Sequence, residues 1–586
     1  MLFIISIFII VLILAISFSI PPKTLCKDSR IAVGFASFFV VIFAVMFSFG
    51  LMGWFNVTGN AVCIMIMFIV AGVGVDDCIV VENFYSKAIE QGKPRGKRVS
   101  AALKRGGLAV FLTSTSSILA FASGNFSDMP GVVGFCTCGA FCFTWVFVLS
   151  VTFFPAMLVI DQRRIERGGL ECLCCDTCCS TTPVLLAKKE GDGDESIAET
   201  KVGRLLTPIL TSGAGKIMIP LVFGAWAAAS TMMMLKNGVG LTVTDVVPDD
   251  SYIAELVETS REHWHGNSYR GMQIVMVGDF YDDEAKVAKM REYFEWLEGR
   301  AFIEGSVGMS EGTWYQHYTG YLDAKGLNRY SDFHANLSPF LEEFKKFRTE
   351  ITCVSGDYGD CSAGIKCAKM PVWQTSKIDT FELYQIEVEI NDKIEEMGFT
   401  TSYNWIDEFG YADADASIEV ATLVSLSTCV AVVMALMLFL MDVGSSVCIF
   451  VCVAFVDMDL LGMMYYWDVK LSSISFSGLI MSIGLSVDYN IHIAHAFLEG
   501  KGGVVERTKH ALDLMGPSVL KGGLTTFMGT VVLSQASSTV FRIFFKICFG
   551  TVVFGIAHGI LLMPVLLGWY VTVFPTGGVV KVSPGL

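Results

Sequence analysis

Three aspartates stand inside long apolar runs of the chain. Asp76 and Asp77 follow the run Gly72-Val-Gly-Val75, and Asp488 follows the similar run Gly484-Leu-Ser-Val487. Ionisable side chains inside a bilayer are unfavourable and usually face the interior of a helix bundle. Adjacent carboxylates repel each other when both are ionised, so such a group can take up and release H+ or hold Na+ through its oxygens. The repeated placement predicts an ion or proton relay, and the simpler alternative is three carboxylates solvated at a membrane surface.

Two histidines extend the same pattern. His492 and His495 follow Asp488 after four and seven residues, so a helix would carry all three side chains near one face. A histidine beside a carboxylate can share a proton near neutral pH. We therefore include both histidines in the predicted relay, and the alternative is that they are polar residues at the end of a membrane helix.

Hydroxyl side chains occur in the apolar runs that follow each aspartate. They could pass on protons or bind a cation, but Ser and Thr inside membrane helices more often bond to carbonyls of their own helix. Both interpretations stay open for Thr113, Ser114, Thr115, Thr525 and Thr526.

The elements that carry these residues are bilayer-length apolar segments. A hydrocarbon core of about 30 Å needs roughly 20 apolar residues as a helix. We expect a polytopic α-helical membrane protein with about 11 transmembrane helices, near residues 1–20, 31–53, 61–82, 107–125, 131–158, 214–236, 418–441, 444–465, 472–497, 517–536 and 541–573. The last segment is long enough for a tilted or bent helix. Segment 1–20 has no basic stretch before its apolar run, which favours a membrane span over a signal peptide.

Composition supports a membrane protein and excludes several other classes. Of the 586 residues, 53% are hydrophobic and only 17% are charged, whereas soluble domains carry nearer a quarter of charged residues. There is no basic domain with interleaved aromatics, so we expect no nucleic-acid partner. Motifs of nucleotide-driven pumps, serine hydrolases and zinc proteases are missing, so we expect no enzyme, no cofactor and no metal centre. An ion gradient of Na+ or H+ should supply the energy for any transport.

One long polar segment, residues 237–417, interrupts the apolar runs. It holds 33 acidic and 15 basic residues, so the chain's net charge of -15 arises there. A β-like run at 272–277, a helical pattern at 282–297 and a second apolar run at 301–303 suggest a βαβ-like order. Helical patterns follow near 331–348 and 380–397. We expect a lumenal or extracellular α/β domain.

Basic residues in the short loops predict the orientation. Lys and Arg concentrate in loops 21–30, 83–106, 159–213 and 498–516, whereas the alternate loops 54–60 and 126–130 have none. The basic loops are therefore expected on the cytosolic side, and the 237–417 domain on the opposite side. The three N-x-[ST] sequons fall on that opposite side. Asn336 is the best glycosylation candidate because it lies far from a membrane span.

The 18 cysteines divide by location. Most lie in apolar runs and are expected to be small core residues. A cytosolic cluster follows a span closely and consists of Cys172, Cys174, Cys175, Cys178 and Cys179. It is a candidate for S-palmitoylation, and two alternatives stay open: the cluster has no special role, or it binds zinc. In the polar domain, Cys353, Cys361 and Cys367 permit one disulfide and one free thiol, with the pairing undecided.

The chain repeats its own layout. Trp54 and Trp467 precede the two aspartate motifs at nearly the same distance, and Pro155 and Pro564 follow them at matching places. Such parallel repeats occur in transporters built from two similar halves. The second half opens with a span and a large polar domain, and the first half shows neither before Met1. We therefore expect that a first span and a first lumenal domain are missing from this sequence.

The two aspartate motifs resemble a known family. Residues 467–497, from Trp467 through Asp488 to Phe497, are similar to the tenth-span signature of Patched-related proteins, which include Patched, Dispatched, the Niemann–Pick C proteins and the patched-domain-containing proteins. Gly72-Val-Gly-Val-Asp-Asp77 resembles their fourth-span signature. Residues 1–160 resemble the sterol-sensing domain, and Val247–Tyr252 resembles the entry to their second lumenal domain.

This resemblance implies an RND-type transporter of sterol or another lipid, driven by Na+ or H+, with Asp76, Asp77 and Asp488 as coupling carboxylates. The alternative is a membrane lipid sensor without transport activity. We expect a multi-pass protein of the plasma membrane or endosomes, with the oligomeric state open. Its expected parts are a five-helix sterol-sensing-like domain (1–160), a cytosolic linker with the cysteine cluster (161–213), a span (214–236), the α/β domain (237–417), a second five-helix domain (418–573) and a cytosolic tail (574–586).

Overall fold

The chain forms two compact units in the computed structural model, one of Met1–Val239 with Ile418–Leu586 and one of Gly240–Ser417. The structure describes residues 30–574 apart from 60, 128, 168–199, 241–250, 254, 257–258, 260–271, 304–312, 357–360, 373–379, 400–402 and 406–408. The first predicted span, the cysteine cluster and nearly all of the tail lie outside the described residues.

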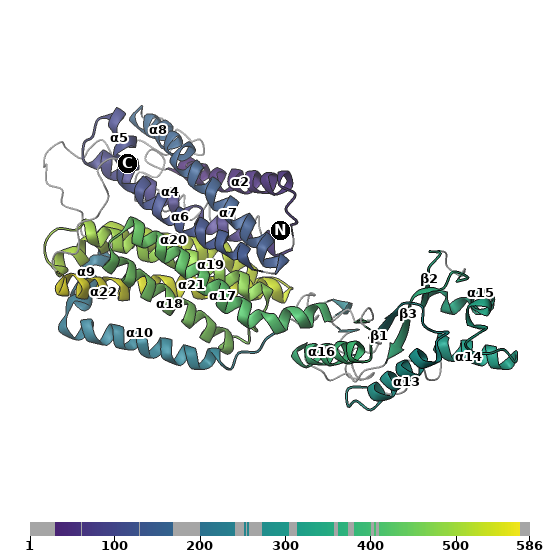
Figure 1. The fold of residues 1–586 in the computed structure, drawn as a ribbon. Helices are drawn as coiled ribbons and strands as arrows, with labels where there is room; N and C mark the ends of the chain where they lie inside the picture. The colour runs from purple at the N-terminus through teal and green to yellow at the C-terminus, as the bar shows by residue number, and fades with distance from the viewer. Residues whose placement is uncertain are drawn as a thin grey trace. The chain divides into compact units, whose positions relative to one another are not determined.

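The first unit is a helix bundle built from two groups of helices that lie side by side (Figure 1). The N-terminal group contains α2 (Ile31–Trp54), η2 (Ala61–Met65), α3 (Ile66–Val73), α4 (Asp76–Glu90), α5 (Arg95–Ala102), η3 (Leu103–Gly107), α6 (Leu108–Ser123), η4 (Gly124–Phe126), α7 (Pro130–Val151) and α8 (Phe153–Glu166).

The C-terminal group begins with two helices that precede the polar domain and continues after it. Its members are α9 (Lys201–Thr211), α10 (Gly213–Met234), α17 (Phe409–Leu440), α18 (Val443–Tyr466), α19 (Ser473–Glu499), α20 (Val504–Val531), η8 (Val532–Gln535), α21 (Thr539–Ala557), η9 (His558–Leu562) and α22 (Met563–Val573). Helix α19 lies at the centre, because it packs against α6 and α7 of the other group as well as α18, α20 and α21.

Nine helical segments among the described residues are long and apolar enough to cross a membrane. They match nine of the eleven predicted spans, and a tenth, 517–536, corresponds to the later part of α20 and η8 and ends one residue beyond η8. Helix α20 is not one of these nine segments. It carries Lys521 as well as several charged residues near its start, so it is less apolar than the others. The last predicted span is interrupted by η9, a stretch of π-helix between α21 and α22.

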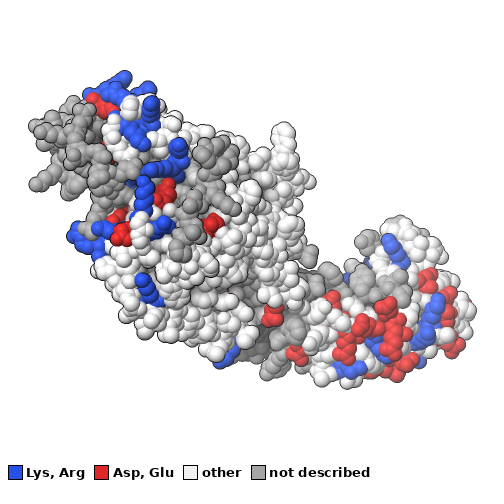
Figure 2. All heavy atoms as spheres, turned by 60° about the vertical axis from the view of Figure 1, so that its left-hand side comes forward, with Lys and Arg blue, Asp and Glu red and all other residues white. Residues whose placement is uncertain are grey.

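The surface of the bundle fits a lipid environment. Helices α10 and α17 bury only 11% and 22% of their most apolar windows, and they expose large apolar side chains such as Trp226 and Leu423. Exposed apolar faces of this extent are expected where lipid tails, not water, surround a helix. Figure 2 shows the bundle as a largely uncharged surface on which Lys and Arg side chains gather toward one end. The chain is therefore an integral multi-pass membrane protein.

The two groups share one interruption that the sequence repeat predicts. Helix α7 ends before α8 at Thr152, and Pro155 follows within the first turn of α8. In the other group, η9 separates α21 from α22, and Pro564 lies in the first turn of α22. Proline removes one helical hydrogen bond and favours a helix start. The matched prolines therefore break equivalent helices at equivalent places.

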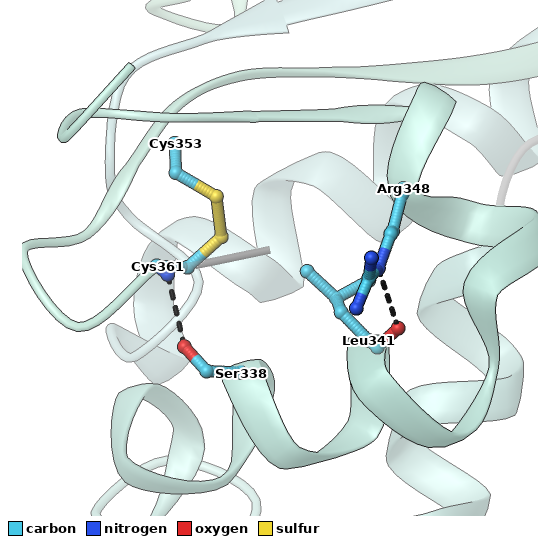
Figure 3. Close-up of a disulfide and its surroundings, with 5 residues drawn as sticks. All are labelled: Ser338, Leu341, Arg348, Cys353 and Cys361. Carbon is cyan, nitrogen blue, oxygen red and sulfur yellow. Dashed lines mark hydrogen bonds between the residues drawn. A yellow bond between two sulfur atoms is a disulfide. The ribbon is translucent and has the colours of Figure 1, made fainter. Parts of the chain in front are cut away.

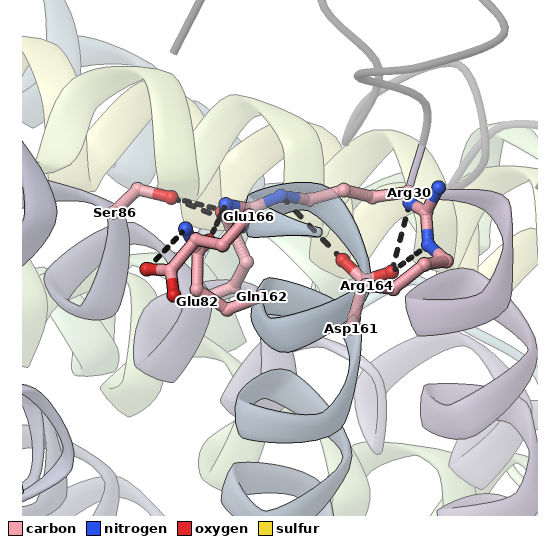
Figure 4. A network of polar contacts seen from close by, with 7 residues as sticks. All are labelled: Arg30, Glu82, Ser86, Asp161, Gln162, Arg164 and Glu166. Atoms are coloured by element: carbon pink, nitrogen blue, oxygen red, sulfur yellow. Dashed lines mark hydrogen bonds and ion pairs between the residues drawn. The ribbon is translucent and has the colours of Figure 1, made fainter. Parts of the chain in front are cut away.

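Ion pairs join three of the loops that carry the basic residues (Figure 4). Arg30 pairs with Glu82 at 2.7 Å and lies within 3.4 Å of Gln162, and Arg98 pairs with Glu166 at 2.7 Å. These residues come from the start of α2, from α4 and α5, and from α8. The three loops therefore meet at one end of the bundle, as the predicted orientation requires.

The second unit is an antiparallel sheet covered by helices. The strand order is β2 (Ile351–Cys353), β3 (Ile365–Val372), β1 (Met272–Val277) and β4 (Tyr403–Trp405). The helices are α13 (Glu284–Glu298), α14 (Trp314–Ala324), α15 (Phe333–Glu343), η7 (Lys345–Thr349) and α16 (Thr380–Glu396). Alternate residues of β1 face a core rich in aromatic side chains. Helices at 282–297, 331–348 and 380–397 are confirmed within a few residues.

Two details of this unit go beyond or against the prediction. The run 301–303 is not a strand of the sheet, and β1 pairs antiparallel with β3 and β4, so the βαβ-like order is wrong. A three-residue apolar run is too short to distinguish a strand from a partly buried turn. The open cysteine pairing resolves as Cys353–Cys361, with Cys367 free, and the Cys361 amide donates to the Ser338 hydroxyl at 2.9 Å (Figure 3).

Candidate functional site

Asp76 and Asp77 occupy the first turn of α4. Helix α3 ends at Val73, and Gly74 and Val75 form a short turn before α4 begins. This break inside one membrane segment places the N-terminus of α4 in the bundle. The positive end of the helix dipole then points toward both carboxylates, which favours negative charge at this position.

Serines of α6 connect Asp77 with Asp488, which lies in the middle of α19. Ser114 donates to Asp77 Oδ2 at 2.8 Å, and Ser117 donates to Asp488 Oδ2 at 3.0 Å. Ser116 lies 3.3 Å from Asp488 Oδ1 and also bonds to a carbonyl of its own helix. One stretch of α6 therefore supplies hydroxyl partners to carboxylates from both halves of the chain.

These side chains line one small polar cavity. Its wall includes Asp76, Asp77, Asp488 and His492, together with Thr113, Ser114, Ser117, Val73, Phe143 and Val146. Asp76 Oδ1 and His492 Nδ1 are buried and have no hydrogen-bond partner among the described residues. Buried polar atoms are rarely left unpartnered. The cavity therefore presents unused acceptor and imidazole positions inside the membrane unit.

Close helix contacts hold Asp76 in place. A side chain on Gly522 of α20 would overlap the Asp76 carboxylate, and a Cβ on Gly72 would lie 2.6 Å from Thr526 Cα. The Thr525 hydroxyl lies 3.4 Å from the Gly72 carbonyl. Small residues allow this approach of α3 and α20. The glycines of the aspartate motif thus have a packing role that brings the carboxylate against the opposite half.

The arrangement suits reversible binding of a small cation or of protons. Three carboxylates around one cavity repel one another while they are ionised, and burial makes this repulsion stronger than in water. Protons or a monovalent cation would relieve it. Carboxylate and hydroxyl oxygens are suitable ligands for Na+. The described residues contain no cluster of three His, Cys, Asp or Glu side chains arranged to hold a metal ion.

The remaining predicted relay residues are placed as follows. His495 is buried but does not line the cavity. Thr115 is half-buried and also lies outside the cavity wall. The hydroxyls of Thr525 and Thr526 donate to the Gly522 carbonyl of their own helix at 2.7 and 2.9 Å. For these two threonines, the geometry favours the alternative of bonds within the helix.

The modification sites are not decided by the structure. Asn336 lies within α15, is half-buried, and donates through its side-chain amide to the Asp332 carbonyl at 3.0 Å. Its glycosylation stays a prediction. The palmitoylation candidates Cys172, Cys174, Cys175, Cys178 and Cys179 lie outside the described residues.

Sequence reasoning missed several polar residues of the membrane unit. Ser116 and Ser117 belong to the same hydroxyl-rich run as Thr113, so extending that run by two residues would have found them. The aspartates of α18, Asp457 and Asp459, were also missed. They are buried, and Asp457 accepts a hydrogen bond from Ser482 at 2.7 Å. Two acids within an otherwise apolar span were the available signal.

Comparisons with known proteins agree with this architecture. Residues 26–178 match the model of the sterol-sensing domain of SREBP cleavage-activation. The chain is 24% identical to NPC intracellular cholesterol transporter 1 homolog 1b of Drosophila melanogaster over 92% of this chain and 48% of that protein. It is 20% identical to protein patched homolog 1 of Caenorhabditis elegans over 94% of this chain and 47% of that protein.

A solved structure gives the same fold. The hedgehog release protein Disp from the water bear Hypsibius dujardini superposes with a TM-score of 0.68 at 13% identity, and the match covers 97% of this chain and 70% of that chain. The chain spans about half the length of the two curated relatives named above. The sterol-sensing segment, the similarity over most of the chain to NPC and Patched proteins and the fold shared with Disp together support a relation to the Patched-related proteins of the RND superfamily.

Proposed function

We propose that this protein is an ion-coupled transporter of a sterol or another lipid, in which Asp76, Asp77 and Asp488 carry the coupling ion. The observation that supports it most is the shared hydrogen bonding of α6 to Asp77 and Asp488. Because the two aspartates belong to different halves of the repeat, a change of charge at either one alters how the halves attract each other. Ion binding and a movement of the halves would then be linked.

The coupling ion is Na+ or H+ in this proposal, and the cavity chemistry accommodates either. Relatives named as cholesterol transporters suggest a sterol as the transported lipid. Burial makes each unneutralised carboxylate unfavourable, so the site should alternate between ion-bound and exchange states only when the helices around it move.

Transport in liposomes tests the proposal directly. The protein is reconstituted with a fluorescent sterol, and sterol movement is followed while a Na+ gradient or a proton gradient is applied. We expect one gradient to drive movement in the wild type and the triple variant Asp76→Asn, Asp77→Asn, Asp488→Asn to abolish it. Asp468→Asn is the matched control, since Asp468 is exposed at a helix end and has a backbone conformation that Asn accepts well. Unchanged sterol movement in the folded triple variant would sink the proposal.

A lipid sensor is the second candidate, and the sterol-sensing match over residues 26–178 supports it. A sensor needs saturable sterol binding but no gradient-driven movement. The same preparation distinguishes the two: sterol binding that persists in the triple variant, with no sterol movement by the wild type under either gradient, favours the sensor.

A further inference from the structure

A second buried acid–base pair lies in the C-terminal half of the membrane unit. His558 begins the π-helical stretch η9, and its Nε2 lies 3.6 Å from Asp459 Oδ2 of α18. His558 is 0% exposed and Asp459 is 1% exposed. π-helical stretches within α-helices occur often at functional positions.

The hydrogen bond made by His558 Nδ1 determines whether Nε2, the nitrogen nearer Asp459, carries a proton. His558 Nδ1 lies 2.8 Å from the Phe554 carbonyl oxygen. A carbonyl oxygen only accepts, so Nδ1 carries a proton and donates it. In a neutral imidazole Nε2 then carries a lone pair, and this nitrogen lies 3.6 Å from a carboxylate oxygen.

Without another proton, this geometry is unfavourable for both partners. Neither Asp459 oxygen nor His558 Nε2 has a hydrogen-bond partner of normal geometry among the described residues, although Ser230 of α10 interacts with Asp459. An unprotonated pair would also bury a full negative charge, and the described part of the chain pairs no Lys or Arg with Asp459. One proton between Nε2 and Oδ2 removes both problems, because the pair then has a donor, an acceptor and no net charge.

Among the described residues, no Lys or Arg side chain is recorded against the pair. The aromatic rings of Phe223 and Phe455 lie against the imidazole, with centroids 4.6 and 6.4 Å away. The elements packed against the pair also carry titratable groups that bond or pack elsewhere: Asp457 accepts from Ser482 of α19, and Tyr489 lies against Gly555 and Gly559. The cations of α21 are likewise engaged, since Lys546 donates to the Trp467 carbonyl and Arg542 to the Thr539 hydroxyl. Helix α10 carries the half-buried Lys216, and α19 carries Asp488 and His492, which line the other cavity, as well as His495 and Glu499.

The pair has no counterpart in the other half of the repeat. Asp459 stands eight residues before Trp467, and Met46 stands eight residues before Trp54. His558 stands six residues before Pro564, and Leu149 stands six residues before Pro155. The repeat therefore provides apolar residues at both equivalent places, so the acid and the base are a paired feature of the C-terminal half alone.

We propose that Asp459 and His558 together form a second proton-binding site, which holds one proton between Asp459 Oδ2 and His558 Nε2 and ties α18 to the C-terminal helix. The site is separate from the Asp76, Asp77 and Asp488 cavity and does not depend on what that cavity binds. Binding and release of this proton would change the charge between the two helices by one unit.

Nuclear magnetic resonance of the full-length protein, carrying isotopically labelled histidine nitrogens, tests the proposal. The signal of His558 is assigned as the one that is missing from the spectrum of the His558→Gln variant. In the wild type, between about pH 5 and pH 8, we expect the chemical shift of its Nε2 to lie between the values of a protonated and an unprotonated imidazole nitrogen. In Asp459→Val we expect it to move to the position of an unprotonated imidazole nitrogen without a partner.

Asp457→Asn is the matched control, since it removes an acid from the same helix two residues away and should leave the His558 signal unchanged. A wild-type signal typical of a bare, unpartnered Nε2 would overturn the proposal without any variant, even if Asp459→Val fails to fold. An equal shift in Asp457→Asn and Asp459→Val would also overturn it. The measurement requires no transport, so its outcome is independent of the proposed function.

Discussion

At the scale of single residues, the hydroxyls of α6 do the most to define the site. An aspartate inside a membrane needs partners, and Asp77 and Asp488 find theirs on the same helix, three residues apart at Ser114 and Ser117. That spacing is close to one helical turn, so both hydroxyls lie on one face of α6. The serines thereby set the distance between carboxylates from the two halves.

Removing these hydroxyls should slow transport without removing the carboxylates. Hydrogen bonds to charged groups contribute about 1.5–3 kcal/mol, so the double variant Ser114→Ala, Ser117→Ala should lower the initial rate of sterol movement by about tenfold or more. Ser123→Ala is the control on the same helix, because Ser123 is buried and donates to the Ala120 carbonyl of α6. Equal losses of rate in the double variant and in Ser123→Ala would show that the serines act only in packing.

The sequence predicted the acids of the site better than their partners. The cavity is lined by Asp76, Asp77, Asp488 and His492. A charged or polar side chain in an apolar span is unfavourable in contact with lipid, so it usually faces the interior of the bundle. Hydroxyls carry no such constraint, since they can bond to their own helix. Thr525 and Ser117 therefore looked alike in the sequence, and only the packing of α6 against α19 separates them.

At the scale of helices, close approach of α3, α4 and α20 holds the site together. Gly522 contacts the Asp76 carboxylate directly, and Gly72 contacts the backbone of Thr526. Both contacts connect the N-terminal group of helices with the C-terminal group. A larger residue at either position would push the two groups apart at the level of the carboxylates.

Gly522→Ala should therefore lower both thermal stability and transport. The new methyl group would overlap Asp76, and overpacking of this kind typically destabilises by about 1–3 kcal/mol. Gly224→Ala in α10 is the control, since no atom lies near a Cβ placed there and alanine favours a helix by about 1 kcal/mol. We expect thermal unfolding in detergent to show a lower midpoint for Gly522→Ala and an unchanged or higher one for Gly224→Ala. The same midpoint in both variants would contradict the assigned contact.

Membrane helices were easier to predict than the elements of the polar unit. Apolar length alone locates a span, and every predicted span within the described residues corresponds to a helical segment. The strands of the polar unit are short, and their pairing depends on contacts far apart in the chain. Strand β1 pairs with β3 at Met272–Val372, about a hundred residues away, and no local pattern encodes that partner.

At the scale of the whole molecule, orientation in the membrane decides which side the polar unit and the basic loops face. The structure brings the basic loops of α2, α4 and α8 to one end of the bundle through the pairs Arg30–Glu82 and Arg98–Glu166. The positive-inside rule assigns such an end to the cytosol. The Cys353–Cys361 disulfide fits the opposite, oxidising side for the polar unit.

A matched pair of introduced cysteines tests this orientation. Gly96 in α5 and Gly320 in α14 are both exposed, and each has open space where a side chain would begin. In sealed vesicles with the cytosolic face outward, a membrane-impermeant maleimide should label Gly96→Cys at once and Gly320→Cys only after permeabilisation, with wild-type labelling as the background. Labelling of both from the same side would refute the opposite placement of the basic loops and the polar unit. Labelling of Gly320→Cys alone would mean that the whole chain is inverted in the membrane.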